Sequence, residues 1–275
     1  MPASVLILTL NEEINLAACL KSVDWSDDVV VFDSYSTDRT IDIAQEAGAR
    51  FVQRRFDNWS AHQNWAMENV VFKNPWVFYL DADERCPADL ATEIRTAVAT
   101  TSNVAFRLRR KDYFMGQWLR RAQLYPTWLV RLFRPEAIRF ERLVNPAPVV
   151  SGNIGKLDGH LDHYPFSHGI RHWVARHNGY SDMEAEEIVK LLGAKRVSLG
   201  ELVSRDPNLR RMALKNFFYL LPARPLAKFI YYYIVRRGFL DGRAGLTYSL
   251  LQSFYEYLIV IKARELVRHQ EELPV

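Results

Sequence analysis

Short apolar runs alternate with amphipathic stretches along the first hundred residues of the chain. The apolar runs are rich in Val, Ile, Leu and Phe and indicate buried strands, whereas apolar residues spaced three or four apart indicate helices. The predicted strands cover residues 4–10, 29–32, 51–52 and 77–80, and the predicted helices cover 14–23, 41–47, 60–69 and 87–98. This alternation predicts an α/β fold with a mainly parallel sheet and right-handed crossovers.

The fourth apolar run leads directly into two carboxylates, in the sequence Trp-Val-Phe-Tyr-Leu-Asp-Ala-Asp-Glu-Arg from Trp76 to Arg85. A buried strand cannot hold unpaired carboxylates in its interior, so we expect Asp81 and Asp83 where the strand leaves the sheet. Alternation sends both side chains to one side, and Ala82 keeps the approach open. Two such carboxylates suit a hard divalent cation, although an acidic turn without function is the simpler interpretation of the pair alone.

Two other predicted strands also end in polar clusters. Thr9, Asn11 and Glu12 follow the first strand, and Asp33 and Ser34 follow the second. Ligands of such sheets bind beyond the carboxyl ends of the strands, so we expect these groups and the Asp pair on one rim. No glycine-rich phosphate loop occurs in these turns, so a cation is needed to neutralise a bound phosphate. The residues predict a metal-assisted site for a phosphorylated, nucleotide-linked small molecule.

These three clusters, in this order, resemble the motifs of family 2 glycosyltransferases with the GT-A fold. The matching segments are 9–13, 33–40 and 81–85, within a similar region of roughly residues 3–145. The most similar branch extends lipopolysaccharide cores and related surface glycans. The resemblance implies an inverting transfer from a nucleotide-diphosphate sugar, usually uridine-linked, to a lipid-linked or lipopolysaccharide-type oligosaccharide. It also implies Mg²⁺ or Mn²⁺ as cofactor.

The same resemblance implies roles for single residues. The residues that face the nucleotide sugar are then Thr9, Asn11, Glu12, Asp33, Ser34, Gln63, Asp81, Ala82 and Asp83. Asp33 would meet the base, Asp81 the ribose and Asp83 the metal, with Asp81 as a second metal ligand. Ser34 stands where the family usually has a second Asp, and Tyr35 where it has Gly, so the contacts there differ from the usual pattern.

The general base that activates the acceptor hydroxyl is identified less directly. Relatives place an acidic residue, often in a His-Glu pair, where this chain has Asn145-Pro146. Glu141 is therefore the predicted base, with Asp158 and Asp162 as alternatives. A surface Glu paired with neighbouring arginines is the structural interpretation of Glu141.

Three further segments have two interpretations each. His163, one of five histidines between residues 160 and 177, could complete the metal shell or serve a structural role. Gln63-Asn64 resembles a polar pair that lies near the donor in relatives. The stretch 116–134 is rich in aromatic residues and Arg, which suits an acceptor or diphosphate wall as well as a core.

The tail differs from the rest of the chain. From residue 205 onward, 12 Lys and Arg face 6 Asp and Glu, and the apolar stretches 217–221, 229–235 and 246–261 lie among them. The window 244–261 is barely long enough to span a bilayer and contains Glu256, so helices lying in the headgroup layer fit better. We expect a GT-A domain over 1–205 and, over 206–275, an amphipathic helical extension that binds the membrane surface; a homo-oligomer interface is the alternative.

Cysteine usage and the lack of targeting motifs limit the cell compartment and the protein classes that the sequence fits. The two cysteines, Cys19 and Cys86, lack metal-type spacing, so we expect a reducing compartment. The N-terminus lacks a signal-peptide pattern, and no segment resembles a nucleic-acid-binding module. We therefore expect a cytoplasmic enzyme at the inner face of the cell membrane. The rival interpretations are a nucleotidyltransferase, which would carry a glycine-rich loop after the first strand, and a non-catalytic membrane-associated scaffold on a decayed transferase fold.

Overall fold

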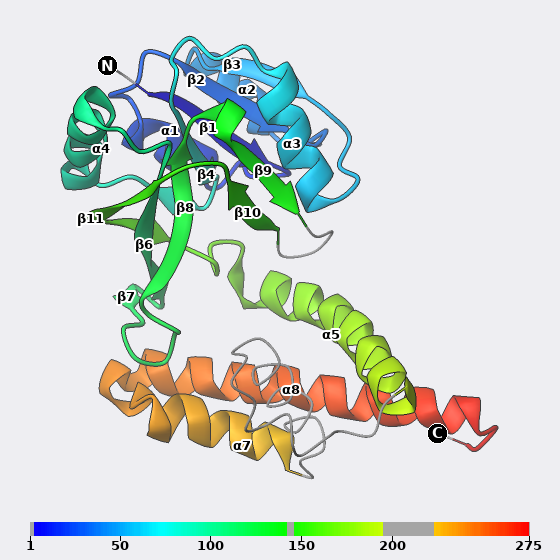
Figure 1. The fold of residues 1–275 in the computed structure, drawn as a ribbon. Coiled ribbons are helices and arrows are strands. Elements are labelled where there is room, and N and C mark those ends of the chain that lie inside the picture. Colours follow the sequence, from blue (N-terminus) through cyan, green and yellow to red (C-terminus); the bar gives the residue numbers. More distant parts are fainter. Residues whose placement is uncertain (1–2, 142–145, 195–222, 275) are drawn as a thin grey trace. The chain divides into compact units, whose positions relative to one another are not determined.

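The computed structural model describes residues 3–141, 146–194 and 223–274 (Figure 1). Their contacts form two compact units. The first unit comprises Met1–Trp118 and Leu124–Ser167, and the second comprises Leu119–Gln123 and His168–Val275. The predicted boundary near residue 205 lies outside the described residues, so the division into 1–205 and 206–275 stays a prediction.

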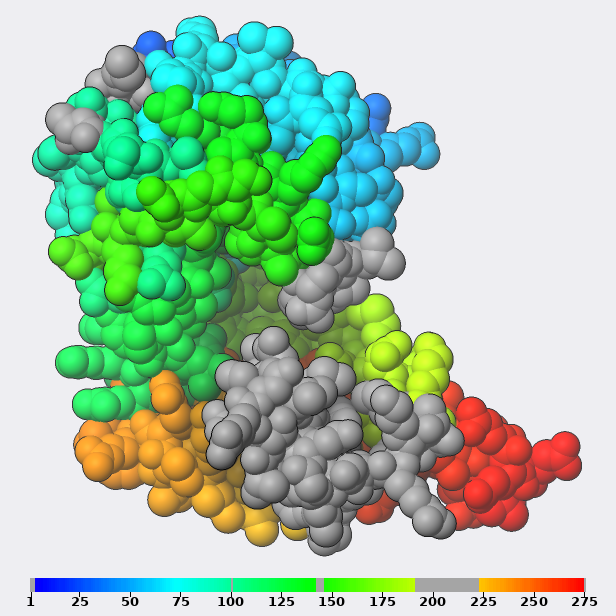
Figure 2. All heavy atoms as spheres, in the orientation of Figure 1, coloured from blue at the N-terminus to red at the C-terminus, as the bar shows by residue number. Residues whose placement is uncertain are grey.

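A mixed nine-stranded sheet forms the centre of the described first unit, in the order β3-β2-β1-β4-β8-β6-β11-β5, with β7 paired to β6. Its strands are β1 (Ser4–Thr9), β2 (Val29–Asp33), β3 (Arg50–Gln53), β4 (Val77–Asp81), β5 (Glu84–Arg85), β6 (Ala105–Phe114), β7 (Gln117–Trp118), β8 (Thr127–Phe133) and β11 (Ile154–His163). The short helix η1 (Pro135–Ala137) leads into an antiparallel pair, β9 (Ile138–Glu141) and β10 (Ala147–Val150). This pair lies beside α3 on the surface of the unit (Figure 2).

The four predicted strands are confirmed as β1 to β4, which pair in parallel. The four predicted helices are confirmed as α1 (Leu16–Ser22), α2 (Thr40–Glu46), α3 (Trp59–Asn69) and α4 (Ala88–Thr100). Strand β1 is buried along its whole length because both faces are covered. Val5 and Ile7 join one core cluster with α1 and α4, whereas Leu6 and Leu8 join a second cluster with α3.

Beyond β4 the sheet becomes mixed, with antiparallel and parallel pairs. Strand β8 runs antiparallel to both β4 and β6, and β11 runs parallel to β6. The two-residue strand β5 directly follows the acidic turn and pairs with the end of β11. This pairing sets Glu84 opposite His163 and Arg85 opposite Asp162. Because side chains alternate along a strand, Glu84 and His163 lie on one face of the sheet and Arg85 and Asp162 on the other.

The second unit is helical. Its described elements are α5 (Gly169–Ala194), α7 (Arg224–Ile230), a π-helical stretch η3 (Tyr231–Val235), η4 (Gly238–Asp241) and α8 (Gly242–Gln270). Helix α8 packs on α5 through a small apolar cluster and pairs with α7, where the buried Arg224 and Glu256 form an ion pair. The Asp241 carboxylate accepts the backbone N–H groups of Arg121 and Ala122, both at 2.7 Å, and so ties residues 119–123 to this unit. No described helix is long and apolar enough to cross a membrane.

Candidate active site

Asp33 joins the carboxyl ends of the first three strands. Its fully buried carboxylate accepts hydrogen bonds from Thr9 Oγ1 at 2.8 Å, Ser36 N at 2.9 Å and Gln53 Nε2 at 3.1 Å. The Ser36 hydroxyl donates a further hydrogen bond to it. Because four donors converge on one carboxylate, Asp33 fixes the backbone on which the predicted nucleotide site is built.

The loop after β1 is clamped to the loop after β2. Asn11 has a left-handed backbone (φ 57°), which Asn tolerates better than most residues. Its N–H donates to Ser36 Oγ at 2.8 Å, and its side-chain oxygen accepts from Thr37 N at 2.8 Å. The Glu12 N–H donates to Thr40 Oγ1 at 2.8 Å. The predicted donor residues of these two loops therefore do come together in space.

Ser34 has a partner that the sequence did not indicate. Its hydroxyl lies 3.3 Å from Nε2 of His62, which is 1% exposed and stacks on Phe32 with a ring separation of 4.3 Å. Burial, and then the nearby Arg54 guanidinium 3.1 Å from Nδ1, lower the pKa of His62 to about 4. A neutral imidazole thus lies beside the Ser34 hydroxyl.

Gln63 reaches the acidic turn through a tyrosine. Its Nε2 donates to the hydroxyl of the buried Tyr79 at 2.7 Å, and that hydroxyl donates to Asp81 Oδ1 at 3.3 Å. The neighbouring Asn64 points elsewhere and holds both backbone polar groups of Phe140, at 2.8 and 2.9 Å. Gln63 is therefore linked to the acidic turn, whereas Asn64 anchors β9.

Asp81 also takes part in a buried ion network. Arg131 Nη2 lies 2.7 Å from Asp81 Oδ2 and 2.8 Å from Glu84 Oε1, and Asp81 N–H donates to Glu84 Oε2 at 3.1 Å. Glu84 is fully buried, which raises the pKa of its carboxyl against the opposing charge of Arg131. Glu84 and Arg131 are not among the predicted site residues; the signal for Arg131 is a lone Arg in the apolar run of β8.

Asp83 faces a histidine. Its Oδ2 lies 3.3 Å from Nε2 of His163, whose Nδ1 lies 2.5 Å from Oδ1 of the buried Asp112. Burial lowers the pKa of His163, but Asp83 and Asp112 outweigh it and raise that pKa to about 9. The predicted Asp83 and His163 are thus brought together, with Asp112 as an unpredicted third member.

These groups fit a divalent cation as two ligands of an otherwise open shell. No cluster of three or more His, Cys, Asp and Glu side chains suited to a metal occurs in the part of the chain that the structure describes. Mg²⁺ and Mn²⁺, however, often take one or two protein ligands and complete the shell with phosphates and water. A carboxylate behind a ligating histidine, as Asp112 is to His163, is the usual support in such sites.

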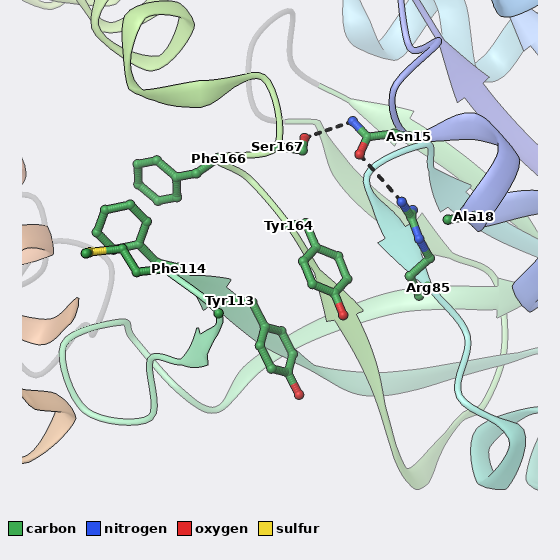
Figure 3. Close-up of a pocket in the computed structure, with 10 residues that line it drawn as sticks. Asn15, Ala18, Arg85, Tyr113, Phe114, Tyr164, Phe166 and Ser167 are labelled. Atoms are coloured by element: carbon green, nitrogen blue, oxygen red, sulfur yellow. Dashed lines mark hydrogen bonds between the residues drawn. The ribbon is translucent and has the colours of Figure 1, made fainter.

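A pocket of about 470 Å³ lies on the opposite face of β5 and β11 (Figure 3). It is lined by Asn15 and Ala18 at the start of α1, by Arg85, by residues 113–116 at the end of β6 and in the turn after it, and by Tyr164, Phe166 and Ser167 after β11. The Tyr164 N–H donates to the carbonyl of Asp83 at 2.9 Å, so the pocket wall continues directly into the acidic turn.

The sequence model of glycosyl transferase family 2 matches residues 4–158, more than half of the chain. The chain belongs to glycosyl transferase family 2. It is 27% identical to an uncharacterised glycosyltransferase of Rickettsia typhi over 96% of this chain and 87% of that protein. It is 28% identical to the lipopolysaccharide core biosynthesis glycosyltransferase LpsC of Rhizobium meliloti, over 75% of this chain and 78% of LpsC. The crystal structure of S. aureus TarS 1-349 aligns over 96% of this chain and 92% of that one, with 14% identity and a TM-score of 0.44.

The predicted family and fold class of this glycosyltransferase are therefore confirmed. Its mixed α/β sheet with flanking helices is GT-A-like, and a C-terminal helix is present. A nucleotidyltransferase is not the family that the sequence matches.

In a glycosyltransferase the acceptor hydroxyl must lose a proton, and the three predicted bases have different environments. Glu141 is exposed at the end of β9, without an ion pair to any described residue, because Arg139 faces Glu68 instead at 3.4 Å. Asp158 is also exposed. Asp162 is half-buried, its Oδ1 has no hydrogen-bond partner among the described residues, and burial raises its pKa.

Proposed function

We propose that this family 2 glycosyltransferase moves a sugar, with inversion, from a UDP-linked donor to a hydroxyl of a lipid-linked or lipopolysaccharide-type oligosaccharide. The observation that carries the proposal is the arrangement of Asp83, His163 and Asp112 just after β4, whose neighbour β1 leads into the loop that is interlocked with the loop after β2. The similarity to LpsC, named for lipopolysaccharide core biosynthesis, supports the acceptor class.

The chain's own residues prepare the site for a diphosphate leaving group. Asp83 and His163 would hold Mg²⁺ or Mn²⁺, and the ion supplies Lewis-acid stabilisation of the diphosphate when bound. Asp112 fixes the orientation of the His163 ring through Nδ1. Tyr79 and Arg131 each donate a hydrogen bond to one oxygen of Asp81, so this carboxylate is held in place. Its proposed partner is a hydroxyl of the sugar nucleotide rather than the metal. Of the two predicted metal ligands, Asp83 is therefore better placed than Asp81 to bind the ion.

The direct test is an assay of nucleotide diphosphate release. The full chain is incubated with a panel of nucleotide sugars, Mn²⁺ or Mg²⁺, and bacterial glycolipid. We expect metal-dependent release of UDP that requires the glycolipid. A chain that neither releases nor binds any nucleotide would favour the non-catalytic scaffold and overturn the proposal.

Glu141 is our proposed base, on the basis of its position in the family pattern, and Asp162 is its competitor. Glu141→Gln should lower kcat by about 10²-fold, because the acceptor hydroxyl would then lack a proton acceptor. The measurement is kcat as a function of pH for Glu141→Gln, Asp162→Asn and Asp158→Asn. A full rate for Glu141→Gln together with a loss in Asp162→Asn would transfer the role to Asp162, whose pKa is already raised by burial.

We further propose that the second unit binds an anionic membrane surface, with the enzyme peripheral to the inner face of the cell membrane. On α8, every exposed residue between Ala244 and Ala263 is large and apolar. These residues are Leu246, Leu250, Phe254, Tyr257 and Ile261. Their spacing of three and four puts them on one face, opposite the buried Tyr248, Ser249, Glu256 and Ile259. An ordinary surface helix carries polar side chains on its outer face.

The paired helix has the same inverted pattern. From Arg224 to Val235 the exposed residues are Leu226, Ile230, Tyr231, Ile234 and Val235. Between 224 and 261 the only exposed charged residues are Arg237 and Arg243, and no exposed residue in that range is acidic. An apolar face flanked by arginines matches a bilayer with anionic headgroups better than a second protein surface.

The proposal predicts binding to anionic vesicles. The double variant Leu250→Ser/Phe254→Ser should lose binding to phosphatidylglycerol vesicles, because it removes apolar area from the inserted face. Arg237→Gln/Arg243→Gln should weaken binding roughly 30-fold, from about 1 kcal/mol per basic residue near an anionic surface. Co-sedimentation with phosphatidylglycerol and with phosphatidylcholine vesicles measures both effects.

The matched control is Val71→Ser, because Val71 is 82% exposed but lies in the first unit. It should bind vesicles as the unchanged chain does. A chain that ignores vesicles and elutes as a dimer, with Leu250→Ser/Phe254→Ser shifting it to monomer, would assign the face to a homo-oligomer instead.

A further inference from the structure

The guanidinium of Arg85 lies in the pocket without a carboxylate partner. By contrast, Arg110 on β6 and Arg131 on β8 each lie within 4 Å of an Asp or Glu. Arg85 instead donates through Nη1 to the carbonyls of Ala82 and Glu84, at 2.7 and 2.8 Å, and through Nη2 to Asn15 Oδ1 at 3.5 Å. These bonds orient its positive charge but do not neutralise it.

Part of the donor capacity of Arg85 remains available. A guanidinium has five N–H donors, and Nε and one hydrogen of Nη2 have no partner among the described residues. A fixed, unneutralised guanidinium with two remaining donors is suited to a phosphate or a carboxylate.

Four aromatic rings form a large part of the pocket wall. Tyr113 and Tyr164 stack with a centroid separation of 5.2 Å, and the Arg85 guanidinium lies 5.6 Å from the Tyr164 ring. Phe114 and Phe166 pack together at 4.1 Å on the neighbouring side (Figure 3). Ring faces beside a few polar groups are typical of pockets for small organic ligands, and they suit the C–H face of a sugar.

We infer that this pocket binds the acceptor through an anionic saccharide, with its sugar ring against Tyr113 and Tyr164 and its phosphate or carboxylate on Arg85. The inference rests on the proposed function and adds the chemical class of the acceptor, a saccharide with an anionic group. Arg85 ends the motif 81–85, but most of the wall comes from residues 113–116 and from Tyr164, Phe166 and Ser167, outside the predicted donor motifs. Asp83 turns to His163 on the other face of β5, away from Arg85.

Asn15 links this pocket to the donor side. It is 2% exposed, and its Nδ2 donates to Glu12 Oε2 at 2.7 Å and to Ser167 Oγ at 2.8 Å. Its Oδ1 accepts the bond from Arg85, so one buried amide connects the predicted nucleotide loop with Arg85 and Ser167 of the pocket wall (Figure 3). An anionic sugar on Arg85 therefore sits beside the donor loop, where an acceptor has to be.

The test compares probes of separate chemistry on the full chain. Glucose 6-phosphate and glucose probe the pocket by saturation-transfer NMR, and inorganic phosphate, which has no C–H protons, is measured by its displacement of glucose 6-phosphate. UDP with Mn²⁺ probes the donor site by calorimetry. We expect glucose 6-phosphate to bind more tightly than glucose or phosphate. Arg85→Gln should weaken glucose 6-phosphate about 10-fold and leave UDP within about twofold. Arg85→Lys should retain part of the affinity for glucose 6-phosphate, because lysine keeps the positive charge but lacks the planar, bidentate donor geometry of the guanidinium.

Two controls keep the outcomes separate. Arg95→Gln, on the exposed side of α4, should change neither ligand. Tyr113→Leu leaves Arg85 untouched and should weaken both sugar probes but not phosphate. Equal weakening of UDP and glucose 6-phosphate in Arg85→Gln would make the pocket a donor diphosphate site and overturn the inference, as would phosphate binding as tightly as glucose 6-phosphate. If the unchanged chain binds glucose 6-phosphate but no UDP, the proposed function fails and the pocket assignment does not.

Discussion

Asp83→Asn should lower the rate of UDP release by about 10³-fold or more while leaving the protein folded. The substitution keeps the shape of the side chain and removes the charge that faces His163 at 3.3 Å. If Asp83 and His163 hold the cation, the variant loses an anionic ligand at the point where the leaving diphosphate must be stabilised. The measurement is UDP release with Mn²⁺ and glycolipid, beside a thermal melt of each protein with and without Mn²⁺.

The melts separate a lost metal site from a damaged fold. Mn²⁺ should raise the Tm of the unchanged chain and not that of Asp83→Asn, because only a bound ligand stabilises the native state. Asp112→Asn should lower the rate of UDP release about 10–100-fold, because the His163 ring is then oriented less firmly but remains available as a ligand. Asp57→Asn changes a partly exposed carboxylate paired with Arg54 and serves as the matched control. An Asp83→Asn enzyme that keeps more than a tenth of its rate would show that the metal lies elsewhere.

The parallel half of the fold could be predicted because its signals are local. Strands β1, β2 and β4 are apolar runs that are almost wholly buried, and a helix of regular period follows each of them along the chain. Strand β3 is shorter and half-buried, with two apolar residues at its centre. The half from β5 onward could not be predicted in the same way. Strand β5 has two residues, and its place depends on pairing with Asp162 and His163, far along the chain.

The candidate site shows the same difference between local features that could be predicted and long-range contacts that could not. The clusters after β1, β2 and β4 could be found because parallel strands end on one rim. What could not be found is which polar groups the protein itself uses: Asp33 accepts four internal hydrogen bonds and Asp81 is held by Arg131. A sequence motif identifies a carboxylate but not its internal partner. The Tyr113–Tyr164 wall also depends on the pairing of β6 with β11.

The tail was predicted in outline. Of its three apolar stretches, 229–235 and 246–261 lie in the described helices α7, η3 and α8, whereas 217–221 lies outside the described residues. Glu256 counted against a membrane span, and the structure gives the reason for its presence: it is buried against Arg224 and Lys228. Composition alone could not assign the apolar residues to an outer face.

Arg131→Leu should lower the free energy of unfolding of the first unit by about 3–5 kcal/mol, because it leaves a fully buried carboxylate without its cation. Glu84 is 0% exposed and Arg131 is 6% exposed, so water cannot replace the lost partner. Chemical denaturation followed by Trp fluorescence measures the loss. The exposed pair Arg139–Glu68 provides the matched control, and Arg139→Leu should cost under about 1 kcal/mol.

The pH dependence of that loss identifies Glu84 as its cause. Burial raises the folded-state pKa of Glu84, and removal of Arg131 takes away the main charge that opposes this shift. A carboxyl whose folded pKa lies above its unfolded value stabilises the fold at low pH and loses that contribution as pH rises past the unfolded pKa. Arg131→Leu should therefore be more destabilised at pH 7 than near pH 5, and Arg131→Leu/Glu84→Leu should recover much of the stability at pH 7. An equal loss at both pH values, without recovery in the double variant, would mean that Arg131 acts by packing on the Tyr79 ring, 4.4 Å away, and not by charge.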